Sequence, residues 1–300
     1  MDLKDFFSTI SISISFFFLG HSPTKIWAQE RRIWQRITPA IVGIREPVGL
    51  KQELEELKAG KRIAHYGSGV IIHPEGWILT SLSIINKASQ VEVILSPSLV
   101  LQGKVVGKDR NLQIALIKIS GKDYPFIPFG NSRTVRIGNA VALLSNTYHS
   151  LSRNRQVTIT TGVISSKHLI TGEQSPYHGT FWETTAAINP GSFGGALVNG
   201  KGELVALALP LLSKRTWLGG GVPVHQIQLV LPYLKKGIQP PQGRLGISVV
   251  QPGLISPKKE VMVDEVDPKG PAAGILQKGD RLVQIDGFPI HSLHDLDKVL

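Results

Sequence analysis

Cysteine is absent from this chain of 300 residues. The lack of thiols excludes a disulfide framework, a thiolate nucleophile and a zinc site with cysteine ligands. It assigns no cellular compartment, because a chain without thiols is compatible with any redox environment. Low-complexity tracts and heptad repeats are absent as well. With 42% apolar and 18% charged residues, the chain has an ordinary globular composition and is long enough for two or three domains with separate cores.

Runs of basic residues are also missing, although the formal net charge is +11. A charge of this sign attracts anionic partners such as a membrane surface, an envelope polymer or a nucleic acid. Lysine and arginine, however, occur at most as doublets such as Arg31-Arg32 and Lys235-Lys236. This scattering indicates a solvated basic surface, so we expect no specific binding of nucleic acid.

No apolar run reaches the length that a comfortable membrane span requires. The N-terminal region holds an apolar core from Phe6 to Leu19, followed by Ile26-Trp27-Ala28 as a cleavage site. We therefore predict that residues 1–28 form a signal peptide and that the protein is exported to the periplasm or cell envelope. Asp2 and Asp5 leave the leading region neutral, so an uncleaved anchor, and with it membrane association, stays open as the alternative.

Short apolar runs recur between turn residues from Gly67 to Leu209. Many brief strands at nearly even spacing predict antiparallel barrels or a sandwich rather than a parallel sheet. Ile37–Ile44 is expected to form an earlier strand, Leu50–Lys61 a short amphipathic helix and Gln226–Leu234 a closing helix. The predicted strands are Val70–His73, Trp77–Ser81, Val91–Leu95, Gly103–Gly107, Ile114–Ile119, Ala140–Leu144, Val157–Ile164 and Leu204–Leu209.

The glycine-rich stretch Asn189–Gly195 bends the chain tightly between two apolar runs. Such a loop can direct backbone N–H groups at a bound oxyanion, as an acyl-transfer site requires. The stretch resembles the loop I-N-P-G-N-S-G-G of the HtrA/Deg family of trypsin-like serine proteases. On that pattern Phe193 takes the place of the nucleophilic serine and Ser192 the place of the asparagine before it. Ser192 is a poor substitute, because neighbouring side chains point in different directions.

Two further motifs carry the resemblance. Gly67–Thr80 is similar to the family's S-G-S-G-V-I-I-x-x-x-G-Y-I-L-T, which continues T-N-x-H-V-V, and Ser83 stands where that pattern has its general-base histidine. Gly107–Ile119 is similar to D-x-x-x-D-L-A-V-L-K-I, and Gln113 stands where the second aspartate orients the histidine. The resemblance therefore implies a triad degenerate at all three positions, no catalytic residue, and a vestigial oxyanion loop of Gly191, Ser192 and Phe193.

The C-terminal part resembles a PDZ domain. Gln242–Ser248 is similar to the loop that captures a peptide carboxylate, which implies Arg244, Leu245, Gly246 and Ile247 as peptide-binding residues. Segments from Val261 to Leu296 match the PDZ pattern in order. The sequence stops at Leu300 within what resembles the helix beside the peptide groove, so we expect the domain to be truncated at its C-terminal end.

Together these resemblances imply an all-β protein, with a trypsin-like double antiparallel β-barrel over residues 29–236, a linker over 237–242 and a partial PDZ domain over 243–300. We expect an inactive serine-protease homologue that binds polypeptides or protein C-termini as a scaffold, chaperone-like or regulatory factor, without cofactor or metal. Two alternatives stay open. One is a serine endopeptidase with a rewired site, and the other is a non-catalytic subunit of a homo- or hetero-trimer with HtrA-type subunits.

Overall fold

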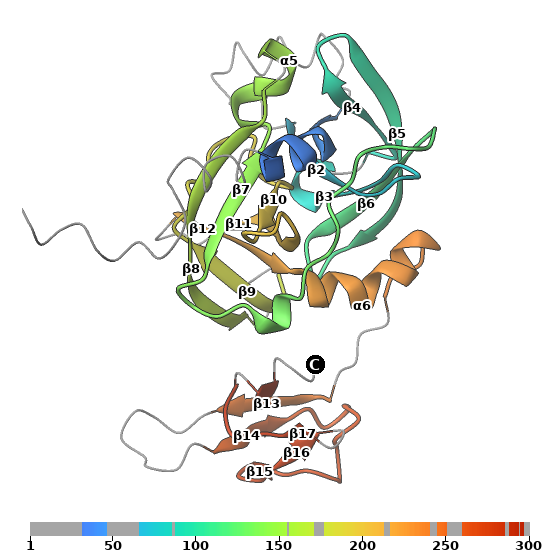
Figure 1. Cartoon of the computed structure of the whole chain (residues 1–300). Helices are drawn as coiled ribbons and strands as arrows, with labels where there is room; N and C mark the ends of the chain where they lie inside the picture. The colour runs from blue at the N-terminus through green and yellow to red at the C-terminus, as the bar shows by residue number, and fades with distance from the viewer. Residues whose placement is uncertain are drawn as a thin grey trace, which may run out of the picture.

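A computed structural model describes residues 32–46, 66–85, 88–154, 156–170, 177–212, 217–240, 245–250, 260–285, 288–293 and 295–296. These residues form two closed six-stranded barrels, a three-stranded sheet and a two-stranded sheet (Figure 1). The predicted all-β class is confirmed. The predicted signal peptide, the predicted helix Leu50–Lys61 and Arg244 lie outside the described residues.

The first barrel has the strand order β1-β2-β3-β6-β5-β4, with every neighbouring pair antiparallel. Branched aliphatic side chains such as Ile71, Leu79 and Ile117 point inward and are fully buried, which is the main source of its stability. Its strands are β1 (Ile41–Arg45), β2 (Tyr66–His73), β3 (Trp77–Ser81), β4 (Gln90–Ser96), β5 (Leu99–Asp109) and β6 (Ile114–Ile119).

The second barrel has the order β10-β11-β12-β9-β8-β7. Trp182 and Leu143 are among the buried side chains that fill it. A larger cluster joins Ile41 and Leu79 of the first barrel with Ala196 and Leu207 of the second, so the two barrels pack against each other. The strands are β7 (Ala140–Ser145), β8 (Thr158–Ile170), β9 (Gly179–Thr184), β10 (Ala196–Val198), β11 (Leu204–Leu212) and β12 (Trp217–Pro223).

The predicted strands are found where the sequence placed them, and β3 and β6 have the predicted bounds. The prediction for Ile37–Ile44 is wrong at its start, because Thr38–Ala40 is a 3₁₀ helix, η1, with Pro39 in its first turn. Proline fixes φ near the helical value and has no N–H to donate to a sheet. The other predicted strands are longer than expected, most of all β5 and β8, and β9, β10 and β12 were not predicted.

Helix α6 (Val224–Lys235) follows β12 and ends in a tight hydrogen-bonded turn. Gly237 has φ +69°, its N–H donates to Leu234 O at 3.0 Å, and Ile238 N–H donates to Tyr233 O at 3.1 Å. This pairing satisfies the last carbonyl groups of the helix and fixes the direction in which the linker leaves. The other short helical segments are α4 (Leu82–Ile85), η2 (Ser132–Thr134), η3 (Thr147–His149) and α5 (Ser150–Asn154).

The C-terminal sheets have a small core of their own. Strand β13 pairs with β14, and β14 pairs with β15. Val261, Val263 and Leu282 pack there with Ile290 and Leu296. The strands are β13 (Ile247–Val250), β14 (Val261–Val266), β15 (Arg281–Leu282), β16 (Gln284–Ile285) and β17 (Phe288–Pro289).

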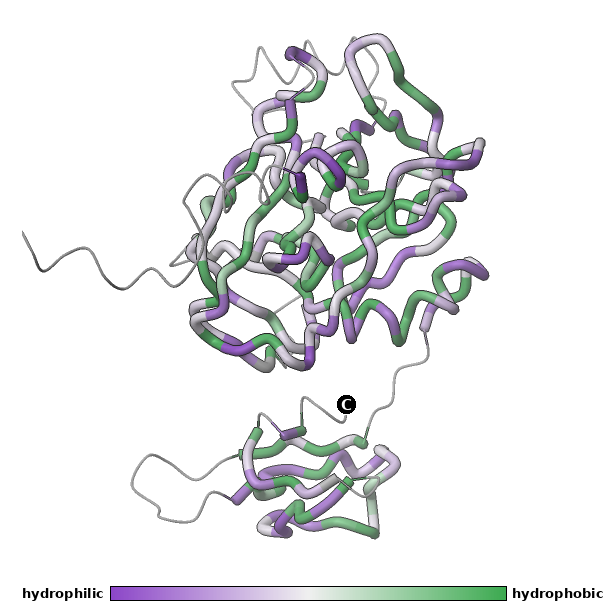
Figure 2. Tube along the Cα trace, in the orientation of Figure 1, coloured by the Kyte–Doolittle hydropathy of each residue, from purple (hydrophilic) through white to green (hydrophobic). Residues whose placement is uncertain are grey.

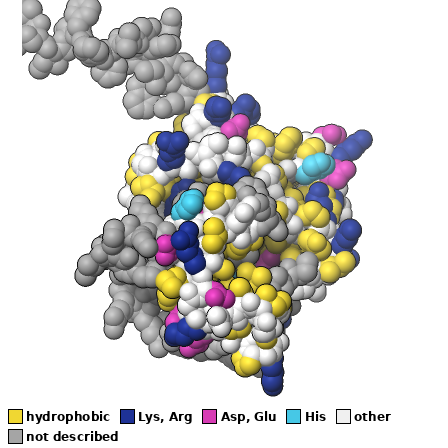
Figure 3. Space-filling model, turned by 90° about the horizontal axis from the view of Figure 1, so that it is seen from below, with side chains coloured by type: hydrophobic (Ala, Val, Ile, Leu, Met, Phe, Trp, Pro, Cys, Tyr) yellow, Lys and Arg dark blue, Asp and Glu magenta, His cyan; other side chains and the backbone are white. Residues whose placement is uncertain are grey.

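The surface of the described residues carries charged side chains of both signs together with exposed hydrophobic ones. In Figure 2 the hydrophobic colour follows the strands of the barrels and the hydrophilic colour is strongest in connecting segments. On the face seen in Figure 3, lysine and arginine side chains are dispersed rather than gathered into one patch. None of the described helices is both long and apolar enough to cross a membrane.

Candidate functional site

The loop between β9 and β10 is tightly bent and fixed by its own backbone. Ser192 N–H donates to Asn189 O at 2.9 Å, and Gly195 N–H donates to Ser192 O at 3.0 Å. Gly191 and Gly194 have φ values of +92° and +79°, which only glycine adopts without strain. The predicted glycine-rich bend is therefore present as a rigid turn.

Strand β2 of the first barrel is hydrogen-bonded to this loop, which belongs to the second barrel. Ser68 N–H donates to Phe193 O at 2.8 Å, and Ser68 Oγ donates to Gly191 O at 2.6 Å. The same hydroxyl accepts from Asn146 N–H at 2.7 Å. A side chain that joins both barrels to one loop fixes the orientation of the loop's peptide groups.

Two N–H groups of the loop are not used in hydrogen bonds between the described residues. In the part of the chain that the structure describes, the N–H groups of Gly191 and Phe193 donate to no protein acceptor, whereas those of Ser192, Gly194 and Gly195 are all engaged. Backbone N–H groups on a fixed turn are suited to hold an oxyanion or a carboxylate. Of these two groups, that of Gly191 belongs to a buried residue and that of Phe193 to a half-buried one.

Ser192 is not exposed to a substrate. Its side chain is fully buried, and its Oγ lies 3.0 Å from Thr147 Oγ1 and 3.3 Å from Ser145 Oγ. The hydroxyl also accepts from Asn189 N–H at 3.2 Å. These contacts satisfy the polar group inside the protein and make Ser192 a structural residue.

Phe193 is half-buried and packs against the core cluster shared by the two barrels. Its phenyl ring carries no group that could attack a carbonyl carbon. The ring is therefore only partly core, because it remains partly accessible to solvent.

Ser83 lies in the first turn of α4, directly after β3. Its side chain is exposed, and its Oγ is 2.7 Å from Ser81 Oγ. A side chain at Gly194 would place its Cβ 3.0 Å from Ser81 N, so α4 begins beside the glycine-rich loop. A serine hydroxyl has no useful basicity near neutral pH and cannot take a proton as an imidazole does.

Gln113 lies in the turn between β5 and β6 with φ +53°. Its backbone O accepts from Leu82 N–H at 2.8 Å, which brings this turn against the start of α4. Its side-chain amide donates to Arg110 O within the same turn. The amide is therefore used locally, and it has no charge with which to stabilise an imidazolium.

His149 is the histidine that the structure places beside the loop, and sequence reasoning did not select it. Its ring stacks on Tyr66 of β2 with centroids 3.5 Å apart, and Tyr148 N–H donates to Pro190 O at 3.0 Å. Burial, with Arg153 and Arg45 nearby, lowers the pKa of His149 below its usual value. No sequence signal links residues this far apart, because the stack depends on the pairing of the barrels.

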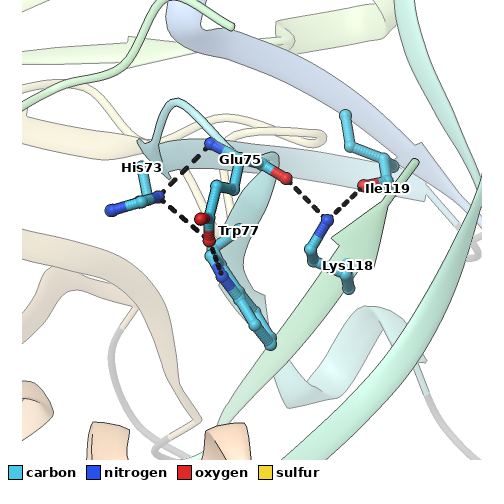
Figure 4. Close-up of polar contacts among 5 residues, drawn as sticks. All are labelled: His73, Glu75, Trp77, Lys118 and Ile119. Atoms are coloured by element: carbon cyan, nitrogen blue, oxygen red, sulfur yellow. Dashed lines mark hydrogen bonds and ion pairs between the residues drawn. The ribbon is translucent and has the colours of Figure 1, made fainter. Parts of the chain in front are cut away.

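Two further histidines of the described residues, His168 and His73, have structural partners. His168 lies in β8, where its Nε2 is 3.0 Å from Glu183 Oε1 on β9. His73 ends β2, and its Nδ1 accepts from Glu75 N–H at 3.3 Å in the turn before β3 (Figure 4). Lys118 secures this turn by donating to Glu75 O at 2.6 Å. None of these contacts involves the glycine-rich loop.

One serine and one histidine are hydrogen-bonded to each other, away from this loop. Ser132 Oγ lies 2.8 Å from His225 Nδ1 and also accepts from His225 N–H at 3.0 Å. Ser132 is 1% exposed, which prevents attack on a substrate. Because Pro223 offers α6 no side-chain cap, the Ser132 hydroxyl satisfies a free N–H at the start of the helix instead.

This pair makes stability depend on pH. Burial, with Arg133 and then Lys167 nearby, lowers the pKa of His225 from 6.5 to about 4. Between these values the unfolded chain binds the proton more tightly, so the free energy of unfolding falls as the pH decreases from 6.5 towards 4. We expect a loss of about 1–2 kcal/mol after allowance for partial solvent exposure. His225→Asn keeps an acceptor and removes the titration. Urea unfolding should therefore show a smaller loss of the free energy of unfolding between pH 7 and pH 4.5 for the variant than for the unaltered protein. Equal losses would contradict the role of His225.

The predicted carboxylate loop of the C-terminal domain is described from Leu245 onward. Gly246 has φ +70°, and its O accepts from Asp267 N–H at 2.7 Å. Leu245 O accepts from Ala272 N–H at 3.0 Å, and Ile247 begins the edge strand β13. With both carbonyl groups bonded inward, the turn leaves the N–H groups of Leu245 and Gly246 without an acceptor among the described residues.

Comparison with known proteins covers both parts of the chain. The pattern of the family described as trypsin-like peptidase domain matches residues 67–207, and that of the PDZ domain matches residues 235–300. Serine endoprotease DegS from Escherichia coli (strain K12) is 32% identical over 253 residues, which cover 78% of this chain and 68% of that protein. A probable periplasmic serine endoprotease, DegP-like, from Pseudomonas savastanoi pv. phaseolicola is 32% identical over 251 residues, which cover 78% of this chain and 50% of that protein. The chain thus spans about half the length of the latter relative.

Solved structures agree with these relatives. HtrA-type protease AlgW with tripeptide superposes with a TM-score of 0.70 at 26% identity and covers 90% of this chain and 87% of that one. The serine endoprotease from Yersinia pestis superposes with a TM-score of 0.62 at 27% identity, covering 94% and 89%. Two barrels joined at a glycine-rich loop and followed by a PDZ domain are therefore matched in sequence and in structure. The chain belongs to the HtrA/Deg family of trypsin-like serine proteases that carry a PDZ domain.

Proposed function

We propose that this member of the family binds polypeptides without hydrolysing them, as a scaffold, chaperone-like or regulatory factor of the cell envelope. The observation that carries the proposal is the chemistry at three positions: Ser83, Gln113 and Phe193 supply a hydroxyl, an amide and a phenyl ring. None of these side chains is a general base near neutral pH, and none at the loop is an activated nucleophile. The burial of Ser192 removes the adjacent hydroxyl as a replacement.

The same relatives support the location and partners that we propose. DegP-like proteins are named periplasmic, which supports export and an envelope location for this chain. The bound tripeptide in the AlgW structure supports peptide ligands. A non-catalytic place in a homo- or hetero-trimer with HtrA-type subunits is compatible with the same binding function.

A rewired endopeptidase is the second candidate, because the relatives are named serine endoproteases. It requires a serine and a base that meet at a surface accessible to substrate. In the described ranges, the serine and histidine that share a hydrogen bond are Ser132 and His225, and Ser132 is buried. The binding function therefore accounts better for the residues present.

Binding of peptide C-termini tests the proposal. We expect the full chain to bind fluorescein-labelled decapeptides of random sequence that end in a free valine, leucine or phenylalanine. The same pool with amidated C-termini should bind about 10–100-fold more weakly, because the amide loses the charge that strengthens each N–H contact. Fluorescence anisotropy measures both affinities.

Gly246→Ala supplies the matched variant. A Cβ at this position would lie 2.8 Å from Gly270 Cα, and φ is +70°, so the turn cannot keep its shape. We expect this variant to lose the preference for the free acid, whereas Gly200→Ala, at a position with open space around it, should keep it. Equal affinity of the acid and amide pools for the unaltered protein would remove peptide-terminus binding.

A further inference from the structure

A groove of about 610 Å³ lies between the first barrel and the end of α6. Strand β5 lines it from Val105 to Lys108, the following turn lines it at Arg110 and Asn111, and the linker lines it from Gly237 to Gln239. It shares no lining residue with the glycine-rich loop or with the loop Leu245–Ile247. The proposed function uses neither wall of this groove.

Both walls are held in place by close packing and hydrogen bonds. A Cβ at Gly107 would lie 2.4 Å from Leu234 O, so only glycine lets the end of α6 approach β5 this closely. On the turn side, Asp109 Oδ1 accepts from Asn111 N–H at 2.8 Å and from Leu112 N–H at 3.0 Å. The groove is therefore formed before any ligand binds, which lowers the entropic cost of binding.

The lining is cationic. Arg110 and Lys108 line the groove, and the Lys108 Nζ donates to Ala88 O at 3.0 Å. Among the described residues, no aspartate or glutamate lines it. Asp109, which lies between Lys108 and Arg110 in sequence, is 2% exposed and directed into the turn. The partial negative charge at the C-terminal end of α6 is unfavourable for a bound anion. Lys235 and Lys236 lie in the same last turn, and their positive charges compensate for it. Charge complementarity thus selects an anionic ligand.

The lining is also partly apolar, which narrows the class of ligand. Ile238 is 54% exposed, and Val105 and Val106 are half-buried beside it. The volume is in the range of about 300–1,000 Å³ that holds drug-sized ligands, and so it accommodates several residues of a peptide. A ligand that carries both carboxylates and apolar side chains fits these surfaces better than a simple inorganic anion.

We propose that the groove binds an acidic segment of a partner polypeptide, independently of any free C-terminus. Carboxylates of the segment pair with the exposed Arg110, and its apolar side chains lie against Ile238 and Val106. A segment bound there contacts both the first barrel and the linker. It therefore restrains the linker where the chain passes from the barrels to the C-terminal domain.

Titration of the full chain with amidated decapeptides tests the proposal. One labelled pool is random in sequence with five glutamates per peptide, and the matched pool has glutamine at those five positions. We expect the acidic pool to bind at least about tenfold more tightly in fluorescence anisotropy, and increasing salt should weaken it. Amidated termini keep this result separate from binding at the carboxylate loop, so either proposal can fail alone.

Arg110→Glu is the decisive variant, since its side chain is exposed and reversal of its charge leaves the core untouched. We expect at least about a tenfold loss of affinity for the acidic pool, and little change for Lys122→Glu, an exposed lysine outside the lining. Hydrogen exchange should show protection of residues 105–111 and 237–239 in the presence of the acidic pool. Absence of binding, equal affinity for the two pools, or an undiminished affinity of Arg110→Glu would overturn the proposal.

Discussion

The combined substitution Ser83→His, Gln113→Asp and Phe193→Ser is expected to create peptide-bond hydrolysis in this chain. The loop already has its bend, its link to Ser68, and N–H groups at Gly191 and Phe193 that are not used in hydrogen bonds between the described residues. What is missing is a base, its orienting carboxylate and a nucleophile, which act as a unit in such sites. We expect casein cleavage on the order of a thousandfold above the background rate of casein without enzyme. Release of labelled fragments from casein measures the gain.

Single restorations serve as controls. Phe193→Ser alone is expected to remain inactive, because the new hydroxyl has no base to take its proton. It should also lower the free energy of unfolding by about 1–2 kcal/mol, since the lost phenyl ring is half-buried. A folded triple variant without hydrolysis would show that the geometry of the loop, and not only its side chains, departs from an acyl-transfer site.

Gly194→Ala is expected to be among the most destabilising single substitutions in the barrels. A Cβ at this position would lie 2.1 Å from Ser68 O and 2.6 Å from Thr80 Oγ1, and φ is +79°. The clash meets backbone rather than a flexible side chain, so β2 and the loop must separate. We expect a loss of at least about 3 kcal/mol in the free energy of unfolding. Urea unfolding followed by tryptophan fluorescence measures it.

Gly200→Ala is the matched control for this prediction. Gly200 lies in the turn after β10, has open space where a Cβ would be, and does not have a positive φ. Its substitution should change the free energy of unfolding by less than about 0.5 kcal/mol. If the two variants unfold at the same urea concentration, the close contact between the barrels at Gly194 is not formed in solution.

Local sequence pattern predicted most strands of the barrels but not the order in which they close. Apolar residues alternate with polar ones or follow one another between clear turns in two segments, Trp77–Ser81 and Ile114–Ile119. Both strands were predicted with the bounds that the structure shows. Strand β12 (Trp217–Pro223) was missed because its three glycines have low strand propensity and are tolerated only through close backbone packing, as where a Cβ at Gly220 would lie 2.0 Å from Trp182 O. The closing pairs β1 with β4 and β10 with β7 join distant segments.

For the candidate site too, the sequence predicted local features but not those that depend on tertiary packing. Motif spacing predicted which residues stand at the bend, at the start of α4 and in the β5–β6 turn. It could not give the burial of Ser192, which depends on Ser145 and Thr147 of another segment. Nor could it give the groove, whose walls at Arg110 and Ile238 come from distant parts of the chain. Sequence pattern reports local chemistry, whereas burial and cavities depend on tertiary packing.

A fluorophosphonate probe tests most directly the central claim that this chain binds polypeptides without hydrolysing them. The probe labels an activated serine covalently, so we expect no labelling of the unaltered protein and no cleavage of casein, whereas the triple variant Ser83→His, Gln113→Asp, Phe193→Ser is labelled at position 193. Labelling of the unaltered protein at Ser192 or any other serine, together with casein cleavage that is abolished when that serine is replaced by alanine, would contradict the claim.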